Sequence, residues 1–408
     1  MVVMSKTLVI VGAGREQIAA YIRAKDMNLT VVGTDIQPDA PALKYADHAI
    51  IASTRDVDST ERALLKYAAN HSVDGVMTIA NDVPYTVAKI ARTLGLPGVA
   101  PDSVVSLTNK LTMKSCFVEN GVNTPSFREV VDARDLEGSQ YPYPFIVKPV
   151  DGRGSRGVLL VDSDTDLTWA YSHAVAHSDI GKVIMEEFVP GPQLSVEGIF
   201  VDGEYKAVAY ADRNYGNLKH TKPFIVEDGG AIPSRFDGPI LEEVRALIER
   251  GARSLGIDWG PVKADIVLLD GHTPCIIELA GRLSGNYLAT HHIPFSYGID
   301  LVGVMIDLST GAEIAIDRLQ PTSHKFLGVR YFFPPPGRIT AINGIDELRK
   351  NTLIHSYMIY SNVGDIQQEI DNHGARAGTV MVRGDNYDDA IKNAVAAIES
   401  VEFVVEPV

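Results

Sequence analysis

The chain has 408 residues, of which 45% are hydrophobic and 22% charged, values typical of a globular protein with two to three domains. Its formal net charge of −15 argues against nucleic acid or an anionic membrane surface as the main partner, but small anionic substrates stay compatible with it. No apolar run approaches the roughly 20 residues of a membrane span. The two cysteines, Cys116 and Cys275, fit a reducing cytoplasm.

Strand and helix signals alternate through residues 1–107. The expected elements are strands at Thr7–Val11, Thr30–Thr34 and Gly75–Ile79, and helices at Arg15–Arg23 and Ser59–Ala69. This alternation predicts a parallel, doubly wound sheet. We expect the domain to form one wall of a substrate site through Gly12–Arg15 and Asn81–Asp82.

The same segment carries two ends of a dinucleotide fingerprint. Gly12-x-Gly14 follows the first strand, and Asp35 lies about 20 residues further on, at the end of the next strand. Gln17 stands at the third small position, where it would crowd the packing of helix on strand. Because the fingerprint is incomplete, a nicotinamide-dependent oxidoreductase is kept only as an alternative.

A helix is expected from Pro101-Asp102 to Asn120-Gly121, with Lys110 and Lys114 on one side at positions i and i+4. The spacing alone predicts that these two lysines lie on a face of the helix that is exposed to solvent.

The stretch "FIVKPVDGRGSRGVLLV" contains Gly152-x-Gly154-x-x-Gly157 between two β-forming runs. A dinucleotide site needs a helix after the glycines, whereas this pattern predicts a strand–loop–strand hairpin. Such a hairpin makes a mobile flap whose amides fold over phosphates, and Lys148 stands just before it. Residues from about 124 to 190 should form a small mobile lobe around the flap.

Two apolar runs, Ala264–Leu269 and Pro274–Leu279, flank the turn signal at residues 270–273. If those four residues form the loop, Asp265 lies directly opposite Glu278. Facing carboxylates repel each other, and a bridging cation removes the penalty. Two hard oxygen ligands suit Mg²⁺ or Mn²⁺ carried by a nucleotide.

Arg282 follows Glu278 by one turn of chain, and its guanidinium suits a phosphate or a carboxylate. The adjacent His291 and His292 have a poor spacing for a metal and are interpreted as ordinary polar residues. Pro334-Pro335-Pro336-Gly337 marks a rigid break before short strand-like runs and a final amphipathic helix.

Together, the lysine before a glycine-rich flap, "IMEEFVPG" and "IIELAGRLSG" resemble the ATP-grasp superfamily of carboxylate–amine ligases. The order and spacing match over most of the chain, in the manner of the L-amino-acid ligase, phosphoribosylglycinamide synthetase and carbamoyl-phosphate synthetase-like branch. The resemblance implies a mixed α/β and α+β fold. Its expected parts are a Rossmann-like pre-ATP-grasp domain (1–107), an ATP-grasp domain (108–330) and a C-terminal α+β domain (331–408).

The resemblance also implies roles for residues. Lys110 and Lys148 would hold ATP phosphates under the flap, Glu186 would accept from the adenine amino group, and the backbones of Glu187 and Val189 would read the ring edge. Asp265 and Glu278 would bind the metal, and Arg282 and Lys148 would act in catalysis. The flap contributes Asp151, Gly152, Arg153, Gly154, Ser155 and Gly157.

Three positions depart from the pattern of the superfamily. Gln193 stands where many relatives carry a glutamate for the ribose hydroxyls, with Glu197 further along the same strand face. Ala280 replaces an asparagine that binds metal, which leaves Asn286 as a substitute. Gly230 stands where relatives close to the amino-acid ligases often carry a histidine.

The sequence therefore predicts a cytoplasmic, ADP-forming ligase that uses ATP and Mg²⁺ to join a small carboxylate to an amine through an acyl phosphate. An amino-acid or dipeptide ligase fits, and a homodimer is compatible with it. Besides the oxidoreductase, a non-catalytic nucleotide-binding protein remains as an alternative.

Overall fold

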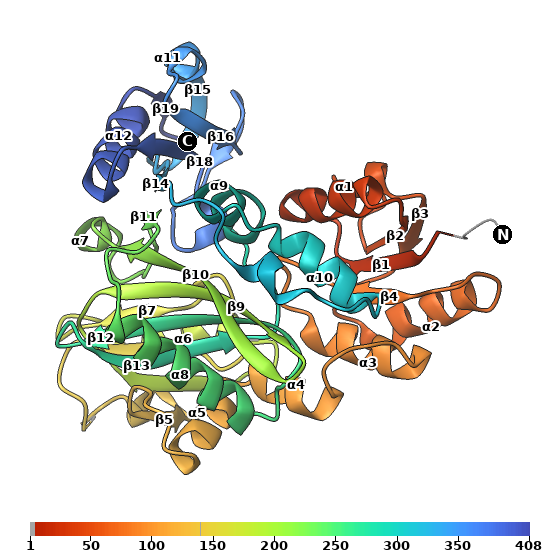
Figure 1. Cartoon of the computed structure of the whole chain (residues 1–408). Coiled ribbons are helices and arrows are strands. Elements are labelled where there is room, and N and C mark those ends of the chain that lie inside the picture. The colour runs from red at the N-terminus through yellow and green to blue at the C-terminus, as the bar shows by residue number, and fades with distance from the viewer. Residues whose placement is uncertain (1–4, 139) are drawn as a thin grey trace.

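The computed structural model describes residues 5–138 and 140–408 and has the predicted parallel sheet at its N-terminal end (Figure 1). The sheet has the order β3-β2-β1-β4, and all its pairings are parallel. Its elements are β1 (Thr7–Val11), α1 (Ile18–Asp26), β2 (Thr30–Asp35), β3 (His48–Ile51), α2 (Val57–Ala68), β4 (Gly75–Met77) and α3 (Pro84–Leu94). Strand β3 was not expected, because its side chains are largely exposed and carry no burial pattern.

Protein groups fill the glycine turn that suggested a dinucleotide. The buried Gln17 donates from Nε2 to Ile79 O at 2.8 Å, and a Cβ on Gly14 would lie 2.7 Å from Gln17 Oε1. Asp35 accepts from the Ala13 amide at 3.0 Å, so its carboxylate holds the turn itself. These contacts argue against the oxidoreductase.

The single helix expected between Pro101 and Asn120 is wrong. The chain forms α4 (Pro101–Thr108) and α5 (Lys110–Glu119), and the extended Asn109 between them caps α5 by accepting from the Thr112 amide. The interpretation of a solvated lysine face is also wrong, because Lys110 and Lys114 are both buried. The break matters because it makes Lys110 the first residue of α5.

A four-stranded antiparallel sheet forms the predicted small lobe, in the order β5-β8-β6-β7. Its elements are β5 (Phe127–Val130), β6 (Phe145–Pro149), β7 (Leu159–Val161), α6 (Leu167–Ala176) and β8 (Val183–Glu187). Pairing of β6 with β7 confirms the strand–loop–strand reading of the glycine motif.

The central sheet has eight strands, in the order β13-β12-β9-β10-β11-β14-β18-β16. They are β9 (Gln193–Val201), β10 (Glu204–Asn214), β11 (Gly229–Ile232), β12 (Gly260–Leu269), β13 (Thr273–Ala280), β14 (Phe326–Tyr331), β16 (Ile354–Ile359) and β18 (Gly378–Gly384). Because β14 pairs with β18, the sheet runs without interruption into the C-terminal region.

The remaining elements lie outside these three sheets. They are α7 (Leu218–Thr221), α8 (Pro239–Ser254), the π-helical turn Leu288–His292, α9 (Ile293–Tyr297), α10 (Leu301–Ser309), β15 (Gly337–Asn343), α11 (Ile345–Lys350), β17 (Ile366–Gln367), α12 (Tyr387–Glu399) and β19 (Glu402–Glu406). Strands β17, β15 and β19 form a small separate sheet, and 3₁₀ turns lie at Arg15–Gln17, Leu43–Tyr45, Ala133–Asp135, Ile316–Leu319 and His373–Ala375.

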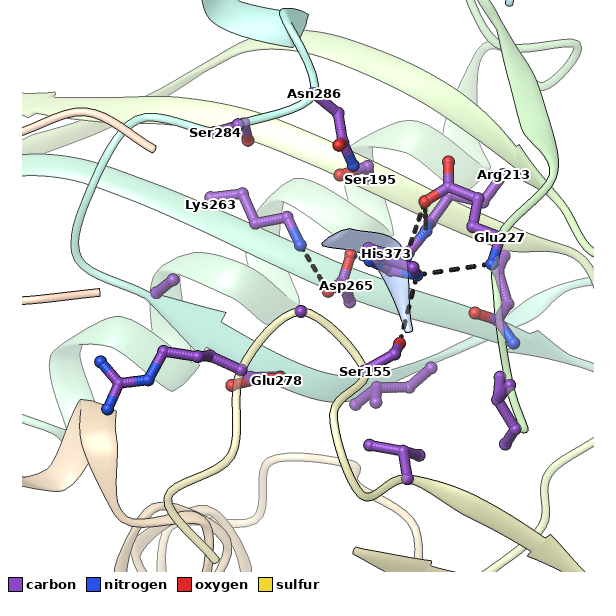
Figure 2. A pocket seen from close by; sticks show the side chains of 18 of the residues that line it. Ser155, Ser195, Arg213, Glu227, Lys263, Asp265, Glu278, Ser284, Asn286 and His373 are labelled. Atoms are coloured by element: carbon purple, nitrogen blue, oxygen red, sulfur yellow. Dashed lines mark hydrogen bonds and ion pairs between the residues drawn. The ribbon is translucent and has the colours of Figure 1, made fainter. Parts of the chain in front are cut away.

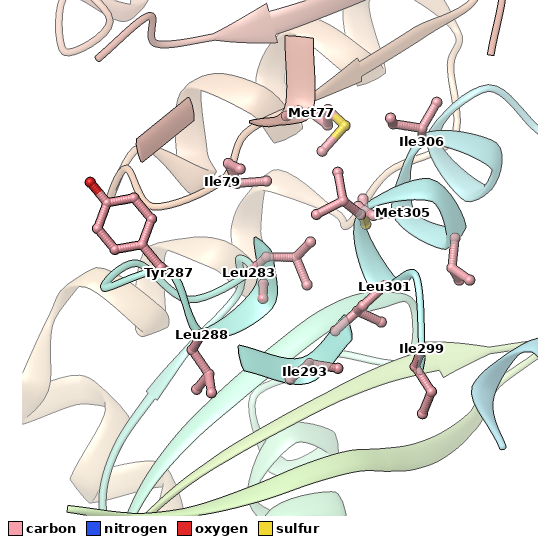
Figure 3. Close-up of a cluster of buried hydrophobic side chains, with 14 of the residues drawn as sticks. Met77, Ile79, Leu283, Tyr287, Leu288, Ile293, Ile299, Leu301, Met305 and Ile306 are labelled. Carbon is pink, nitrogen blue, oxygen red and sulfur yellow. The ribbon is translucent and has the colours of Figure 1, made fainter. Parts of the chain in front are cut away.

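One hydrophobic core joins the N-terminal sheet to the rest of the molecule. Met77 and Ile79 pack in the same cluster as Leu283, Leu301 and Met305 (Figure 3). Burial of such side chains contributes about 1.5–3 kcal/mol each, so this core fixes the N-terminal domain as a wall beside the central sheet. Among the described residues, no helix is long and apolar enough to cross a membrane.

Candidate active site

A cavity of about 650 Å³ lies between the small lobe, the central sheet and the N-terminal domain. Of the predicted site residues, its wall contains Lys110, Lys148, Gly152, Arg153, Gly154, Ser155, Glu186, Glu187, Val189, Gln193, Asp265, Glu278 and Arg282. Asp151 and Gly157 belong to the flap but not to the wall. Asn81 and Asp82 line the cavity as expected, whereas Glu16 stands there in place of Gly12–Arg15.

Asp265 lies opposite Glu278 across the β12–β13 hairpin, as the register arithmetic predicts. The route to this pairing differs from the expectation. The loop is shorter, since Leu269 pairs with Thr273, and a bulge between Asp265 and Ile266 adds one residue back on β13. Such a bulge bends the strand and re-aims side chains, which places Ile277 beside Glu278 in the cavity wall.

Protein cations compensate the charges of this carboxylate pair. Arg213 Nη1 lies 2.7 Å from Asp265 Oδ1, and Lys263 contacts the other oxygen. Burial alone would raise the pKa of Asp265, but the charges of Arg213 and Lys263 outweigh it and hold the pKa at about 2. Lys110 Nζ lies 3.1 Å from Glu278 Oε1. Both carboxylates therefore lie at the cavity surface with a cationic side chain beside them (Figure 2).

A second cluster forms where α5 meets the small lobe. Lys148 Nζ lies 2.8 Å and Lys114 Nζ 3.3 Å from the same oxygen of Glu186, and all three side chains are buried. Burial lowers the pKa of Lys114 to about 8, although Glu186 opposes that shift. The adenine contact of Glu186 stays a prediction, and the structure adds a second task for it, the neutralisation of two lysines.

The flap is folded against its neighbours. Asp151 accepts from Ser178 Oγ at 2.6 Å, and Arg153 donates to Asp82 O at 3.1 Å and to Asp179 at 2.9 Å. Gly154 and Gly157 have φ values of +62° and +71°, in the left-handed region that favours glycine.

The chain between the small lobe and the central sheet lines the cavity through Glu187, Val189 and Gln193. The Glu187 amide donates to Ser126 O at 2.9 Å, so it is not available to a base. Gln193 begins β9 and faces the cavity, whereas Glu197 on the same face lies outside the wall and accepts from the Ser284 amide at 3.2 Å. Of these two polar side chains, only Gln193 lines the cavity, and its contact with the ribose stays a prediction.

Arg282 is oriented by the N-terminal domain. Its Nε donates to Asp82 Oδ1 at 2.5 Å, and its side chain is only 16% exposed. Despite burial, the charge and hydrogen bond of Asp82 raise the pKa of Arg282 above its ordinary value. A fixed, permanently charged guanidinium therefore faces the cavity.

Several residues of the cavity wall were not predicted from the sequence. Lys263 lies two residues before Asp265 on the same strand face, a signal that could have been used. Arg213 lies on β10, at the start of a stretch that shows no clear period. His373 and Arg376 come from the C-terminal domain, and no local pattern connects them to the flap.

The structure also shows the surroundings of three further residues that the sequence singled out. Asn286 Oδ1 accepts from Arg376 at 2.8 Å rather than lying free beside Asp265 and Glu278. A Cβ on Gly230 would come within 2.2 Å of Asp212 O, so this backbone admits no histidine there. His292 is buried in the wall, burial lowers its pKa to about 3, and its Nε2 has no partner among the described residues.

Comparison with known families assigns most of the chain. Residues 107–286 match the ATP-grasp domain, residues 26–98 the ATP-grasp N-terminal domain, and residues 330–406 the L-amino acid ligase C-terminal domain 2.

Relatives and solved structures agree with this assignment. The chain is 24% identical to the uncharacterized protein y4rH of Sinorhizobium fredii over 99% of its own length and 84% of that protein. It is 23% identical to alanine–anticapsin ligase of Bacillus subtilis, with 71% of this chain and 64% of that protein covered. The crystal structure of L-amino acid ligase from Bacillus licheniformis superposes with a TM-score of 0.84 at 20% identity, covering 98% of this chain and 99% of that one.

The fold and the site thus define an ATP-grasp protein, and the chain belongs to the ATP-grasp superfamily. Within it, the chain is an ATP-binding enzyme of the carboxylate–amine ligase group, whose members act on small molecules.

Proposed function

We propose that the protein is an ADP-forming ligase that activates an amino acid as an acyl phosphate and joins it to the amine of a second small molecule. The observation that carries the proposal is the set of compensated charges around one cavity. Three cations, Lys110, Lys148 and Arg282, line the cavity. The carboxylates Asp265 and Glu278, which lie opposite each other across the hairpin, line it as well. The names of the relatives, including an L-arginine-specific L-amino acid ligase, favour an amino acid as the acid.

The residues present fit a divalent cation bound together with nucleotide phosphates. Two carboxylates face the cavity on adjacent strands, and among the described residues no group of three or more potential ligands forms a complete protein site. Asp265 and Glu278 would hold Mg²⁺ or Mn²⁺, which would neutralise charge on the β- and γ-oxygens. In this structure, the positive charges of Arg213, Lys263 and Lys110 balance the negative charges of these carboxylates.

In the proposed reaction, an oxygen of the substrate carboxylate attacks the γ-phosphorus, the bond from that phosphorus to the bridging oxygen breaks, and ADP leaves. The amine then attacks the acyl carbon and releases phosphate. Lys110 and Lys148 would hold phosphate charge, while Arg282, fixed by Asp82, would orient the carboxylate and the acyl phosphate. Position and charge suffice, because no covalent nucleophile is needed.

Pairwise screening of amino acids and amines for nucleotide products tests the proposal. Turnover should release ADP and inorganic phosphate in equal amounts, and hydroxylamine should trap the activated acid as a hydroxamate. Arg282→Ala should remove both signals. Arg318→Ala, which breaks a pair with Asp307 outside the cavity, should keep them. AMP and pyrophosphate as products would contradict the mechanism, and ATP binding without turnover on any pair would favour the non-catalytic alternative.

A further inference from the structure

A short segment of the C-terminal domain, residues 372–376, reaches into the cavity between the flap and the central sheet. It contains the 3₁₀ turn His373–Ala375, which Asn372 caps by accepting from the Gly374 amide at 2.8 Å. In Figure 2, His373 lies between Ser155 of the flap and Glu227 of the central domain. We call residues 372–376 the latch segment.

The latch segment binds the flap through both backbone and side chain. The His373 amide donates to Gly154 O at 3.1 Å, and His373 Nε2 lies 3.1 Å from Ser155 Oγ. The Glu227 amide also points at Nε2, at 3.4 Å. A backbone N–H can only donate, so Nε2 is an acceptor, the imidazole is neutral, and Ser155 Oγ donates to it.

Arg376 ties the latch segment to the opposite side of the cavity. Its guanidinium is buried and donates to His373 O at 2.8 Å, Glu227 O at 3.2 Å and Asn286 Oδ1 at 2.8 Å. It also lies over the Tyr331 ring, 3.6 Å from its centroid. One side chain thus fixes the turn that holds the flap and the loop that carries Asn286.

We propose that His373 and Arg376 are positioning residues that couple closure of the flap to placement of the Asn286 side of the cavity. The inference rests on the proposed function and deepens it. Neither residue is assigned a contact with the reacting atoms. Their effect is to hold a closed, water-poor site while the activated acid waits for the amine, so that transfer to the amine outruns hydrolysis.

Trypsin cleavage within the flap tests the latch without any substrate. Arg153 is a tryptic site whose side chain is only 22% exposed and is held by Asp179, so cleavage after it requires the flap to open. His373→Ala removes the acceptor of the Ser155 hydroxyl, a hydrogen bond worth about 1 kcal/mol, and should therefore raise cleavage after Arg153 by about fivefold.

Two further variants separate the latch from general damage. His373→Gln supplies an acceptor oxygen near the position of Nε2 and should restore most of the protection. His355→Ala alters a partly buried histidine of the same domain that packs on Phe295 outside the cavity, and flap cleavage should stay at the wild-type rate. Equal cleavage of wild type and His373→Ala would overturn the proposal, as would equal sensitivity of His355→Ala.

The coupling itself is read from the ratio of ADP released to product condensed, once a substrate pair is found. The ratio should rise several-fold in His373→Ala. It should also rise in Arg376→Lys, because an ammonium cannot serve three acceptors in the planar fork of arginine. An unchanged ratio in both variants would overturn the coupling. Wild-type protein that forms no product on any pair would instead count against the proposed function, while the cleavage test would still judge the latch.

Discussion

At the scale of single residues, the facing pair Asp265 and Glu278 illustrates how a buried charge repulsion is relieved. The hairpin places like charges opposite each other, which by itself is destabilising. Arg213 and Lys263 contact Asp265, and Lys110 contacts Glu278. Loss of either carboxylate would therefore leave a cation without its partner rather than relieve a repulsion.

Glu278→Ala should lower turnover at least about 100-fold, the scale seen when one electrostatic contact to a transition state is removed. Stability should fall by about 1 kcal/mol, because the buried Lys110 loses its charged partner and keeps only the bond to Gly152 O. Steady-state kinetics and urea unfolding measure the two effects. A variant with wild-type turnover would remove Glu278 from the metal pair.

Glu197 gives a second test at this scale, through pH. Its carboxyl is fully buried, and burial raises its pKa to about 7 from the ordinary value of 4.5. Between those two values the folded state holds a proton that the unfolded chain has lost, so this group lowers stability as pH rises through the window. The loss is on the order of 3 kcal/mol and is complete above pH 7.

Glu197→Gln keeps an acceptor for the Ser284 amide and removes the titration. We expect the variant to unfold at similar urea concentrations to wild type at pH 4.5 and to be clearly more stable at pH 8. Urea unfolding at both pH values checks this, and a stability difference that does not change with pH would show that Glu197 is not the titrating group.

At the scale of elements, the flap is an antiparallel hairpin whose loop depends on glycines with positive φ. Gly154 and Gly181 have nearly the same backbone, with φ values of +62° and +68°. A Cβ at Gly154 would lie no closer than 3.5 Å to another residue, and one at Gly181 would meet nothing within 4 Å. Strain rather than collision therefore dominates a substitution at either position.

Gly154→Val and Gly181→Val should each cost about 1–2 kcal/mol of stability, because an L side chain is strained in the left-handed region. Only Gly154→Val should also weaken ATP-dependent turnover, since Gly181 lies outside the cavity. Parallel unfolding and kinetic measurements on both variants separate the two effects. Equal turnover in the two variants would contradict the assignment of the flap.

At the scale of the whole molecule, the N-terminal domain contributes a wall rather than a cofactor site. Asp82 orients Arg282, Gln17 fills the glycine turn, and Asp35 holds the backbone of that turn. Shared packing of Met77 and Ile79 with Leu283 keeps the wall in place (Figure 3). The Gly12–Gly14 resemblance to a dinucleotide site thus has a structural explanation.

Mg-ATP should therefore raise the unfolding temperature, whereas NAD should not. A ligand present at 100 times its dissociation constant stabilises the native state by about 2.7 kcal/mol. Thermal-shift curves with each compound give the comparison. Stabilisation by NAD and not by Mg-ATP would reverse the assignment of the two nucleotide motifs.

Three features could be predicted from the sequence alone: the parallel N-terminal sheet, the strand–loop–strand hairpin around the glycines and the pairing of Asp265 with Glu278. These features depend on periodicity and turn chemistry within short stretches, which neighbouring residues encode. The predicted pairing is observed although the turn is shorter than expected, because the bulge in β13 shifts the register back by one residue. The break at Asn109 was missed because the helical pattern continues through it.

Which charges neutralise one another, and which segments meet around the cavity, could not be predicted from the sequence and follows from the tertiary packing. Lys114 and Lys148 share Glu186, Arg213 reaches Asp265, and His373 meets Ser155 from 218 residues away in the sequence. These contacts depend on distances of a few ångströms between side chains that lie far apart in the sequence. No local pattern specifies those distances, because packing of the central sheet and the C-terminal domain sets them.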